Sequence, residues 1–282
     1  MKVAILGIVH PRGLGFLKEN GFQIFEIKNF EIENLKEQLK DVDGILLRTS
    51  KLGKDILQHC NNLKIISRHG VGYDNVDLDF LNKNKIALGI TSTSNAVSVA
   101  EHVLSFFIYI TKNFSLSDRL VKEGNFEKRS QLPNFFELYK KKVLIIGFGR
   151  IGKEVAKRCL GFDMEVYVYD PFLDNKIIIK DQCVPIEKNR GLEIADFVTI
   201  HLPLNENTKN FISQSELNMM KKNSVLVNTS RGGIVNEDDL YKALKSKKIK
   251  GAGMDVFVSE PPEANHPFFK LDNILLTPHN AA

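Results

Sequence analysis

The sequence predicts an α/β protein with two doubly wound domains, each built on a parallel sheet. Its 282 residues are too many for one domain of ordinary size and suit two. Strand and helix patterns alternate along most of the chain, as in a parallel sheet covered by helices on both faces. A glycine-rich turn at 147–152 lies between two of these strand patterns. We place the domain boundary between residues 92 and 93, which gives domains 1–92 and 93–282.

The first domain shows strand patterns separated by helix patterns. We expect strands at Lys2–Gly7, Phe22–Ile27, Gly44–Arg48, Lys64–Ser67 and Ile86–Ile90, and helices at Leu14–Asn20, Ile32–Lys40, Lys54–Cys60 and Leu78–Asn82. Ligands of such a sheet bind beyond the carboxyl ends of its strands. Segments 48–51 and 68–75 follow two of these ends, and the glycines of the second could present N–H groups to an anion. Taken alone, a turn that needs positive φ explains the same glycines.

A long apolar segment, Ala96–Phe114, leads from the first domain into the second. As a helix it would be apolar on nearly all sides, which predicts that most of its surface is buried. A helix that passes from one domain into another meets this condition, and so does a helix in a subunit interface. The following region, Phe114 to Tyr139, is polar with scattered aromatic residues.

Segment 141–170 has the pattern of a strand, a turn, a helix and a second strand. An apolar run, Val143–Ile146, is short enough to be a strand buried on both faces. An amphipathic helix, Ile151–Leu160, follows the turn. The second strand, Glu165–Tyr169, ends on Asp170.

Each part of this unit has a role in binding a dinucleotide. Gly147 allows the tight turn, Gly149 lets the backbone approach a pyrophosphate, and Gly152 lets the helix pack close to the strand. The helix start offers N–H groups and a positive dipole end to phosphates. Asp170 is placed to accept hydrogen bonds from the adenosine ribose. S-adenosylmethionine could use the same acid, but the downstream motifs argue against it.

Beyond Asp170 the alternation resumes, so the mononucleotide-binding pattern occurs twice, as a dinucleotide fold requires. We expect strands at Phe197–Leu202, Ser224–Asn228, Gly251–Val256 and Ile274–Leu276, and helices at Ser213–Lys222 and Glu237–Lys248. Polar motifs follow these strands, and three of them contribute a charged side chain: Arg231, Glu260 and His279.

The three charged side chains suit reversible hydride transfer to a 2-keto acid. The fork of Arg231 fits a carboxylate or a keto acid. His279 can move a proton near neutral pH, and Glu260 beside it would fix its tautomer and favour its protonated form. Taken one at a time, such residues more often form surface ion pairs or cap loops. Their joint placement after successive strands favours the catalytic interpretation.

Composition narrows the remaining possibilities. The net charge of +5 is spread along helix faces, which suits small anionic ligands and does not indicate a nucleic-acid partner. No apolar stretch is long enough to span a bilayer, so we expect no membrane partner. The three cysteines, Cys60, Cys159 and Cys183, form no CxxC pair and indicate reduced thiols in a cytoplasmic protein. The histidines show no zinc-type spacing, so we expect no metal.

The motifs together resemble those of the NAD-dependent D-2-hydroxyacid dehydrogenases, particularly the D-3-phosphoglycerate dehydrogenase branch. The matching segments run almost from end to end: RHGVGYDNVD (68–77), NAVSVAEH (95–102), GFGRIG (147–152), HLPLNENT (201–208), NTSRGGIVNEDDL (228–240), GAGMDVFVSEPP (251–262) and LLTPH (275–279). The resemblance implies a flavodoxin-like substrate domain and a Rossmann NAD-binding domain with the active site in the cleft. It implies a homodimer through the helix at 96–114, and a role in serine biosynthesis.

The resemblance also implies a role for each site residue. Arg231 binds and polarises the keto acid, His279 is the acid and base, and Glu260 holds it. Asp255 meets the nicotinamide carboxamide. The other cofactor contacts are Gly147, Gly149, Arg150, Ile151, Gly152, Asp170, His201, Pro203, Thr208, Thr229 and Ser230. The substrate contacts are the backbone of Gly70, Val71 and Gly72, together with Arg48, which with Lys51 is placed to help a phosphate.

The sequence leaves the substrate and one other class of function open. Hydroxypyruvate, glyoxylate or another 2-keto acid could replace 3-phosphohydroxypyruvate. A dinucleotide-sensing binding protein is the second class, because transcriptional corepressors of this fold keep the same Arg, Glu and His. Family members continue after the TPH segment with a glycine and a helix, whereas this sequence ends at Ala282. Either the chain continues beyond this point or the protein lacks that helix, and without the helix we expect the cleft to close less well and His279 to be held less rigidly.

Overall fold

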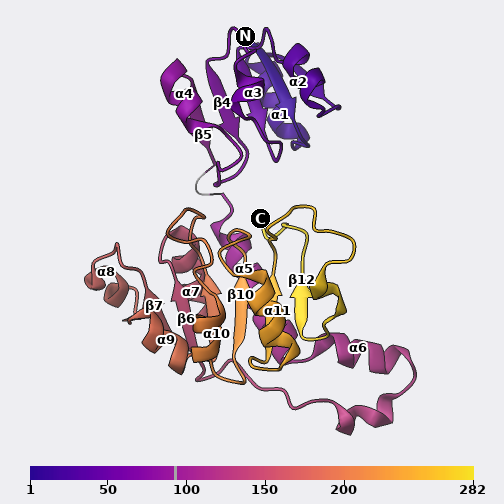
Figure 1. The fold of residues 1–282 in the computed structure, drawn as a ribbon, viewed down its shortest axis with the longest axis vertical. Coiled ribbons are helices and arrows are strands. Elements are labelled where there is room, and N and C mark those ends of the chain that lie inside the picture. The colour runs from indigo at the N-terminus through magenta and orange to yellow at the C-terminus, as the bar shows by residue number, and fades with distance from the viewer. Residues whose placement is uncertain (92–93) are drawn as a thin grey trace. The chain divides into compact units, whose positions relative to one another are not determined.

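The computed structural model describes residues 1–91 and 94–282, and the chain divides into two compact units, Met1–Asn95 and Ala96–Ala282. Figure 1 draws the first unit in indigo to purple and the second in magenta to yellow. The boundary that the sequence predicts, between residues 92 and 93, lies outside the described residues. Each unit contains a parallel sheet with helices, so the predicted fold class is confirmed.

The first unit is built on a five-stranded parallel sheet in the order β2-β1-β3-β4-β5, which is the flavodoxin-like order. Its strands are β1 (Lys2–Leu6), β2 (Gln23–Ile27), β3 (Gly44–Leu47), β4 (Ile65–Arg68) and β5 (Ala87–Ile90). Its helices are α1 (Pro11–Glu19), α2 (Ile32–Gln38), α3 (Lys54–Leu57) and α4 (Leu78–Asn84). Helix α3 is shorter than predicted, because the N–H groups of His59 and Cys60 bond three residues back and tighten the chain.

The second unit is built on a seven-stranded parallel sheet in the order β12-β11-β10-β9-β6-β7-β8. Its strands are β6 (Lys142–Ile146), β7 (Glu165–Tyr169), β8 (Val184–Pro185), β9 (Phe197–Ile200), β10 (Val225–Asn228), β11 (Gly251–Met254) and β12 (Ile274–Leu276). Counted from β6, this is the 3-2-1-4-5-6 order of a dinucleotide-binding fold with β12 added at one edge. The order reverses between β6 and β9, and ligands of such sheets bind beyond the carboxyl ends of the strands at this reversal.

Helices cover both faces of the second sheet (Figure 1). The helices of this unit are α5 (Ala96–Thr111), α6 (Phe114–Lys122), α7 (Arg150–Gly161), α8 (Asn175–Lys180), α9 (Lys188–Ile194), α10 (Gln214–Met219) and α11 (Glu237–Lys245), with the 3-10 helices η1 (Phe126–Gln131) and η2 (Pro267–Lys270), and of these α6 and η1 contain no buried residue. The sequence patterns predict α5, α7, α10 and α11. They do not predict α6, α8, α9, η1, η2 or β8.

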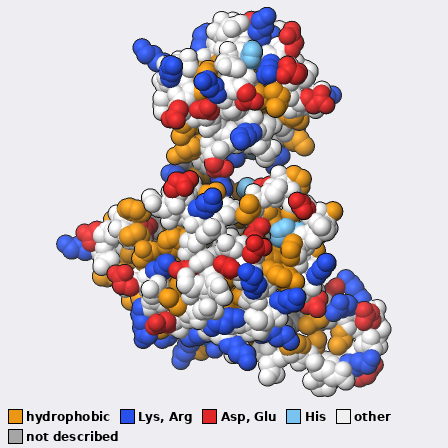
Figure 2. Space-filling view, viewed as in Figure 1, with side chains coloured by type: hydrophobic (Ala, Val, Ile, Leu, Met, Phe, Trp, Pro, Cys, Tyr) orange, Lys and Arg blue, Asp and Glu red, His pale blue; other side chains and the backbone are white. Residues whose placement is uncertain are grey.

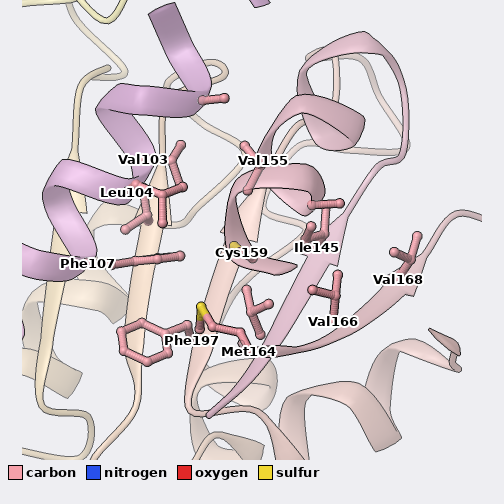
Figure 3. Close-up of a cluster of buried hydrophobic side chains, with 14 of the residues drawn as sticks. Val103, Leu104, Phe107, Ile145, Val155, Cys159, Met164, Val166, Val168 and Phe197 are labelled. Carbon is pink, nitrogen blue, oxygen red and sulfur yellow. The ribbon is translucent and has the colours of Figure 1, made fainter. Parts of the chain in front are cut away.

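The two faces of β6 point into two different hydrophobic clusters. Val143 and Ile145 belong to the cluster under α5 and α7, whereas Leu144 and Ile146 belong to the cluster on the opposite face. Figure 3 shows the first cluster, where side chains of α5 and α7 meet those of β6 and β7. Burial on both faces explains why the strand is a continuous apolar run in the sequence.

Helix α5 buries most of its apolar side chains within its own unit, although Val97 is 48% exposed. It packs against α7 and against β10, β11 and β12. Its buried residues are Ala96, Val99, Ala100, Val103, Leu104, Phe106, Phe107 and Thr111. The apolar character of this helix therefore does not require a partner subunit, contrary to the reason on which the sequence-based dimer prediction rests.

Exposed apolar side chains occur instead on the segment after α5, residues 114–139, which we call the arm. Helices α6 and η1 of the arm contain no buried residue. Its large exposed apolar side chains are Phe114, Val121, Phe126, Phe135 and Tyr139, each between 48% and 59% exposed. The arm thus carries apolar surface that its own unit leaves uncovered.

The described residues have three further properties. None of the helices that they form is both long and apolar enough to cross a bilayer. The cysteines are free thiols, and burial raises the pKa of Cys60 and of Cys183 to about 11. Figure 2 shows acidic and basic side chains mixed over the visible face, with Lys and Arg gathered along the lower edge of the second unit.

Candidate active site

The glycine-rich turn leaves β6 and enters α7 where the strand order reverses. Gly147 has a φ of +91°, and a Cβ atom built on it would lie 2.7 Å from the carbonyl oxygen of His201. A Cβ atom on Gly152 would lie 2.2 Å from the carbonyl oxygen of Gly147. Both positions therefore need glycine, one for the turn and the other for the close approach of helix and strand.

No steric contact among the described residues of the protein requires glycine at position 149, the N-cap of α7. The φ of Gly149 is −73°, and a Cβ atom built on it would meet no atom within 4 Å. No side chain caps α7, and its first turn holds no acidic residue. The N–H groups of Arg150 and Ile151 at the start of α7 are therefore available to a phosphate, and glycine at 149 keeps the approach open.

Asp170 follows β7 and is fixed beside the turn. Its Oδ2 accepts a hydrogen bond of 2.8 Å from the N–H of Phe148, and its Oδ1 accepts one of 3.0 Å from the N–H of Phe172. Each carboxylate oxygen has two acceptor positions, so both can still receive a ribose hydroxyl. Asp170 therefore orders the turn as well as offering acceptors next to it.

Two buried polar atoms lie at the carboxyl ends of the central strands β9 and β10. They are Nδ1 of His201 and Oγ1 of Thr229, and neither has a hydrogen-bond partner among the described residues. Burial lowers the pKa of His201 to about 3, so its ring is neutral, and its Nε2 lies 3.0 Å from Oγ1 of Thr199. Buried polar atoms in proteins are nearly always paired. These two atoms fit a site in which a bound cofactor supplies the partners.

The segment after β9 closes on itself. The hydroxyl of Thr208 donates to the carbonyl of Pro203 at 2.6 Å and accepts from the N–H of Asn205 at 2.8 Å. Its one hydroxyl proton is therefore used inside the turn. The structure gives Thr208 and Pro203 a role in shaping this turn, and any contact of Thr208 with a cofactor must use the remaining acceptor position of its hydroxyl.

The loop after β10 is held from within by Asn228, which is fully buried. The Nδ2 of Asn228 donates to the carbonyl of Arg231 at 2.9 Å. Its Oδ1 accepts from the N–H of Ser230 at 3.0 Å and from the Ser230 hydroxyl at 2.7 Å. Asn228 therefore fixes the backbone that carries Arg231, a function that the sequence motif alone did not reveal.

Asp255, after β11, is 1% exposed and holds the C-terminal segment. Its Oδ1 accepts from the Thr277 hydroxyl at 2.5 Å and from the N–H of Asn280 at 3.0 Å, and its Oδ2 accepts from the N–H of Ala281 at 3.1 Å. One acceptor position on Oδ2 is left for a carboxamide. The nitrogen Nε2 of His102, on α5, lies 3.0 Å from the Thr277 hydroxyl, a contact that sequence reasoning also missed.

His279 and Glu260 form a hydrogen-bonded pair. The Nδ1 of His279 lies 2.7 Å from Oε2 of Glu260, and Oε1 of Glu260 accepts from the N–H of Phe257 at 3.0 Å. The hydrogen bond to Glu260 raises the pKa of His279 above its ordinary value, against the opposing effect of burial. Burial alone would raise the pKa of Glu260, but the hydrogen bonds from His279 and Phe257 outweigh it and lower that pKa.

Arg231 is close enough to this pair for its charge to act on both members. It lowers the pKa of Glu260 and opposes the rise in the pKa of His279. Its Nη1 donates to the carbonyl of Ser230 at 2.7 Å. The structure therefore brings together the three charged side chains that the sequence singled out after successive strands.

The predicted substrate contacts lie in the first unit, after β3 and β4. Arg48 is exposed, and its N–H bonds to the carbonyl of Leu6 at 2.9 Å. Gly70 has a φ of +152°, and a Cβ atom built on it would collide with the guanidinium of Arg68. Val71 and Gly72 are partly exposed in the same loop. These residues line the carboxyl edge of their own sheet, as the sequence predicts.

Comparison with known proteins identifies the family. Residues 104–281 match the NAD-binding domain of the D-isomer specific 2-hydroxyacid dehydrogenases. The chain belongs to this family. As the family assignment implies, its second unit is an NAD-binding domain, and NAD is the cofactor.

Individual family members carry different names. A D-3-phosphoglycerate dehydrogenase of Archaeoglobus fulgidus is 33% identical over 100% of this chain and 53% of its own length. A glyoxylate reductase of Thermococcus litoralis is 36% identical over 93% of this chain and 84% of its own. The crystal structure of the NAD-dependent formate dehydrogenase of Staphylococcus aureus in complex with NAD superposes with a TM-score of 0.87, at 31% identity, over 100% of this chain and 89% of that one. This chain thus spans about half the length of the phosphoglycerate dehydrogenase that it matches.

Proposed function

We propose that this chain is an NAD(H)-dependent D-2-hydroxyacid dehydrogenase that transfers a hydride between the cofactor and a 2-hydroxy or 2-keto acid. The observation that carries the proposal is the pairing of His279 with Glu260 at 2.7 Å, within the electrostatic reach of Arg231. An acid, its orienting carboxylate and a permanent cation are the groups that this reaction needs beside a nicotinamide.

His279 is the proposed proton donor in reduction. Because Nδ1 bonds to Glu260, Nε2 is the ring atom left to meet the substrate oxygen. Glu260 fixes this orientation and stabilises the imidazolium that must be present before reduction. In oxidation, the neutral ring accepts the proton from the substrate hydroxyl at the same atom.

Arg231 is the proposed binder of the keto acid. Its guanidinium offers a planar fork to the carboxylate and a charge that stabilises the negative charge developing on the substrate oxygen. The internal bonds of Asn228 fix the backbone on which this fork stands. When bound, the nicotinamide supplies or accepts the hydride, while the chain provides orientation and the proton.

The proposed cofactor contacts follow from the positions described above. The start of α7 receives the pyrophosphate over Gly149, and Asp170 accepts from the adenosine ribose. His201 and Thr229 offer their unpartnered polar atoms near the reversal of strand order. Ser230 and Asp255 complete the proposed set, Asp255 through the one acceptor position that its carboxylate has left.

For the substrate, we propose 3-phosphoglycerate and its keto acid, 3-phosphohydroxypyruvate. Support comes from the phosphoglycerate dehydrogenases among the relatives and from Arg48 and Lys51, cations that follow β3 in the first unit. The Gly70–Gly72 backbone would receive the substrate carboxylate. Hydroxypyruvate and glyoxylate are the alternatives, since other relatives are named as reductases of these acids. With the phosphorylated substrate, the chain would act in serine biosynthesis in the cytoplasm.

We further propose that the chain works as a homodimer. The sequence-based reason, an apolar helix at 96–114, is replaced by the exposed apolar side chains of the arm that directly follows α5. A second copy that covers the arm would remove these side chains from water.

A substrate panel tests the function. The purified chain is mixed with NADH and, separately, with 3-phosphohydroxypyruvate, hydroxypyruvate, glyoxylate and pyruvate, and NADH absorbance is followed. The highest kcat/KM is expected with the phosphorylated acid. If hydroxypyruvate or glyoxylate gives the highest kcat/KM, the proposed substrate is wrong but the proposed reaction stands. Tight NADH binding with no turnover on any acid refutes the reaction and favours the dinucleotide-sensing alternative.

A further inference from the structure

Glu237, in the first turn of α11, reaches out of its helix to the loop that carries Glu260. Its Oε1 accepts a hydrogen bond of 2.8 Å from the backbone N–H of Val258. Its Oε2 lies 3.4 Å from Nε2 of His266, and the two side chains are only 17% and 14% exposed. Neither the proposed proton transfer nor the proposed substrate binding uses this carboxylate.

His266 holds the other end of the Glu237 carboxylate in one orientation. The Nδ1 of His266 accepts from the N–H of Phe268 at 3.3 Å, so the neutral ring carries its proton on Nε2, which faces Glu237. The ring packs against Phe257, Phe268 and Phe269, with ring centroids 4.8 to 5.7 Å apart. His266 therefore fixes Oε2 of the Glu237 carboxylate, while Oε1 binds the loop.

The hydrogen bond that Glu237 accepts from the loop is adjacent in sequence to the hydrogen bond that orients Glu260. Glu237 holds the N–H of Val258, and Glu260 holds the N–H of the preceding residue, Phe257. The side chain of Val258 is 66% exposed, so packing of that side chain does not fix the loop. The series of hydrogen bonds from His266 through Glu237, the loop backbone and Glu260 ends at His279.

We propose that Glu237 is a positioning residue that fixes the loop at Val258, beyond the buried Val256 and Phe257, and thereby holds the Glu260 carboxylate against His279. The proposal deepens the proposed function, on which it rests for the role of His279. The carboxylate acts through the loop backbone and touches neither substrate nor cofactor. His266 acts with it by fixing its orientation.

Helix capping does not explain the geometry of Glu237. Helix α11 already has Asn236 as its N-cap, which accepts from the N–H of Asp239 at 3.0 Å. Asp238 and Asp239 supply further negative charge in the same turn. Asp238 is exposed, so Asp238→Ala is the matched control, since it removes the same charge from the same turn without touching the loop.

The test measures the pKa of His279 directly. The protein is titrated with its imidazole proton signals followed by NMR, and the His279 signal is assigned by its loss in His279→Gln. The charged groups that act on His279 are Glu260, Arg231 and Asp255, so its pKa reports their placement. In Glu237→Ala the pKa is expected to fall toward the ordinary histidine value. In Asp238→Ala it is expected to stay raised.

Glu237→Gln and Glu237→Asp complete the series. Glutamine keeps one oxygen that can accept from Val258, but its NH2 group would face the Nε2–H of His266, so it is expected to retain only part of the raised pKa. Aspartate keeps the charge but is one methylene shorter, so Glu237→Asp is expected to lose part of the rise in the pKa of His279. This variant replaces Glu237→Ala in the test if Glu237→Ala does not fold. The proposal is overturned if a folded Glu237→Ala or Glu237→Asp melts at a lower temperature while the pKa of His279 stays at its wild-type value, because the role is then structural only.

Kinetics separate this inference from the proposed function. With an active substrate, Glu237→Ala should lower kcat and move the fall of the reduction rate to lower pH, while the Kd of NADH is unchanged. If Glu237→Ala lowers kcat by the same factor at every pH and leaves the shape of the pH profile unchanged, the positioning role of Glu237 is contradicted. If the unmodified chain reduces no 2-keto acid, the proposed function fails, yet the NMR titration still decides whether Glu237 places Glu260.

Discussion

A Cβ atom on Gly232 would lie 1.9 Å from the carbonyl oxygen of Phe257. The loop after β10, which carries Arg231, and the loop after β11, which leads to Glu260, thus meet backbone to backbone. Only a residue without a side chain permits this approach, because a carbonyl group cannot rotate aside as a flexible side chain can. This contact therefore helps to set the distance between the cation and the acid–base pair, together with the hydrogen bonds of Asn228 and Glu237.

Gly232→Ala is expected to separate the two loops. The overlap should cost about 1–3 kcal/mol of unfolding free energy, and a displacement of Arg231 of about 1 Å should lower kcat/KM roughly a hundredfold. Thermal unfolding and steady-state kinetics measure the two effects. Gly161→Ala is the control, since its Cβ would meet no atom within 4 Å. Activity within a few-fold of wild type for Gly232→Ala would show that the loops adapt.

The pH dependence of reduction should follow the His279–Glu260 pair. Because the pKa of His279 is raised, the protonated form needed for reduction is fully present below that pKa and is lost as the pH rises through it. Glu260→Gln removes the stabilising charge and should move the fall in rate to lower pH. His279→Ala should lose about 10²–10⁴-fold in rate. An unchanged profile in Glu260→Gln, with proton transfer rate-limiting, would falsify the pairing.

Asp170 should make the enzyme prefer NAD over NADP. A carboxylate beside the ribose repels a 2′-phosphate, and the next residues, Pro171 and Phe172, offer no compensating cation. Asp170→Ala should narrow the ratio of kcat/KM values for NADH and NADPH. It should also lower the melting temperature, because Asp170 accepts from Phe148 and Phe172. Equal kcat/KM values for both cofactors in the unmodified chain would contradict the assignment.

The arm should mediate dimer formation. Phe126 and Phe135 are 57% and 59% exposed, and a charge at either position should weaken an interface that covers them. Light scattering of Phe126→Asp and Phe135→Asp should show a smaller particle than the unmodified chain. Phe16→Asp, at a 65% exposed position on α1, is the control and should leave the size unchanged. A monomer at all concentrations of the unmodified chain would rule out the dimer.

The elements that sequence reasoning found share a clear pattern of burial. Strand β6 has side chains in clusters on both faces, so its apolar run is unambiguous. Strand β8 has two residues and is too short to show the alternation of apolar and polar residues by which a strand is predicted. Helix α9 contains Gly191, where a Cβ would lie 2.6 Å from a methyl group of Leu144, so a glycine that close packing requires weakens the helical pattern of this short segment. The arm escaped prediction because α6 and η1 bury none of their residues.

Within the candidate site, the positions of the proposed catalytic side chains were predictable and those of their supports were not. Arg231, Glu260 and His279 follow successive strands, and parallel strands bring such positions to one edge. Asn228 and Glu237 act on the backbone of neighbouring loops, and those hydrogen bonds depend on how the loops fold. Nothing in the residue types or their spacing specifies that geometry, so it became visible only in the structure.

The buried neutral ring of His201 gives the protein a built-in spectroscopic reference. With a pKa of about 3, this imidazole carries no charge over the range of about pH 5 to 8 in which ordinary histidines titrate. Its proton signals should therefore hold their position while those of His279 move. A shift of the His201 signals at constant pH would then report a ligand at the reversal of strand order, so one titration experiment can separate protonation from occupancy.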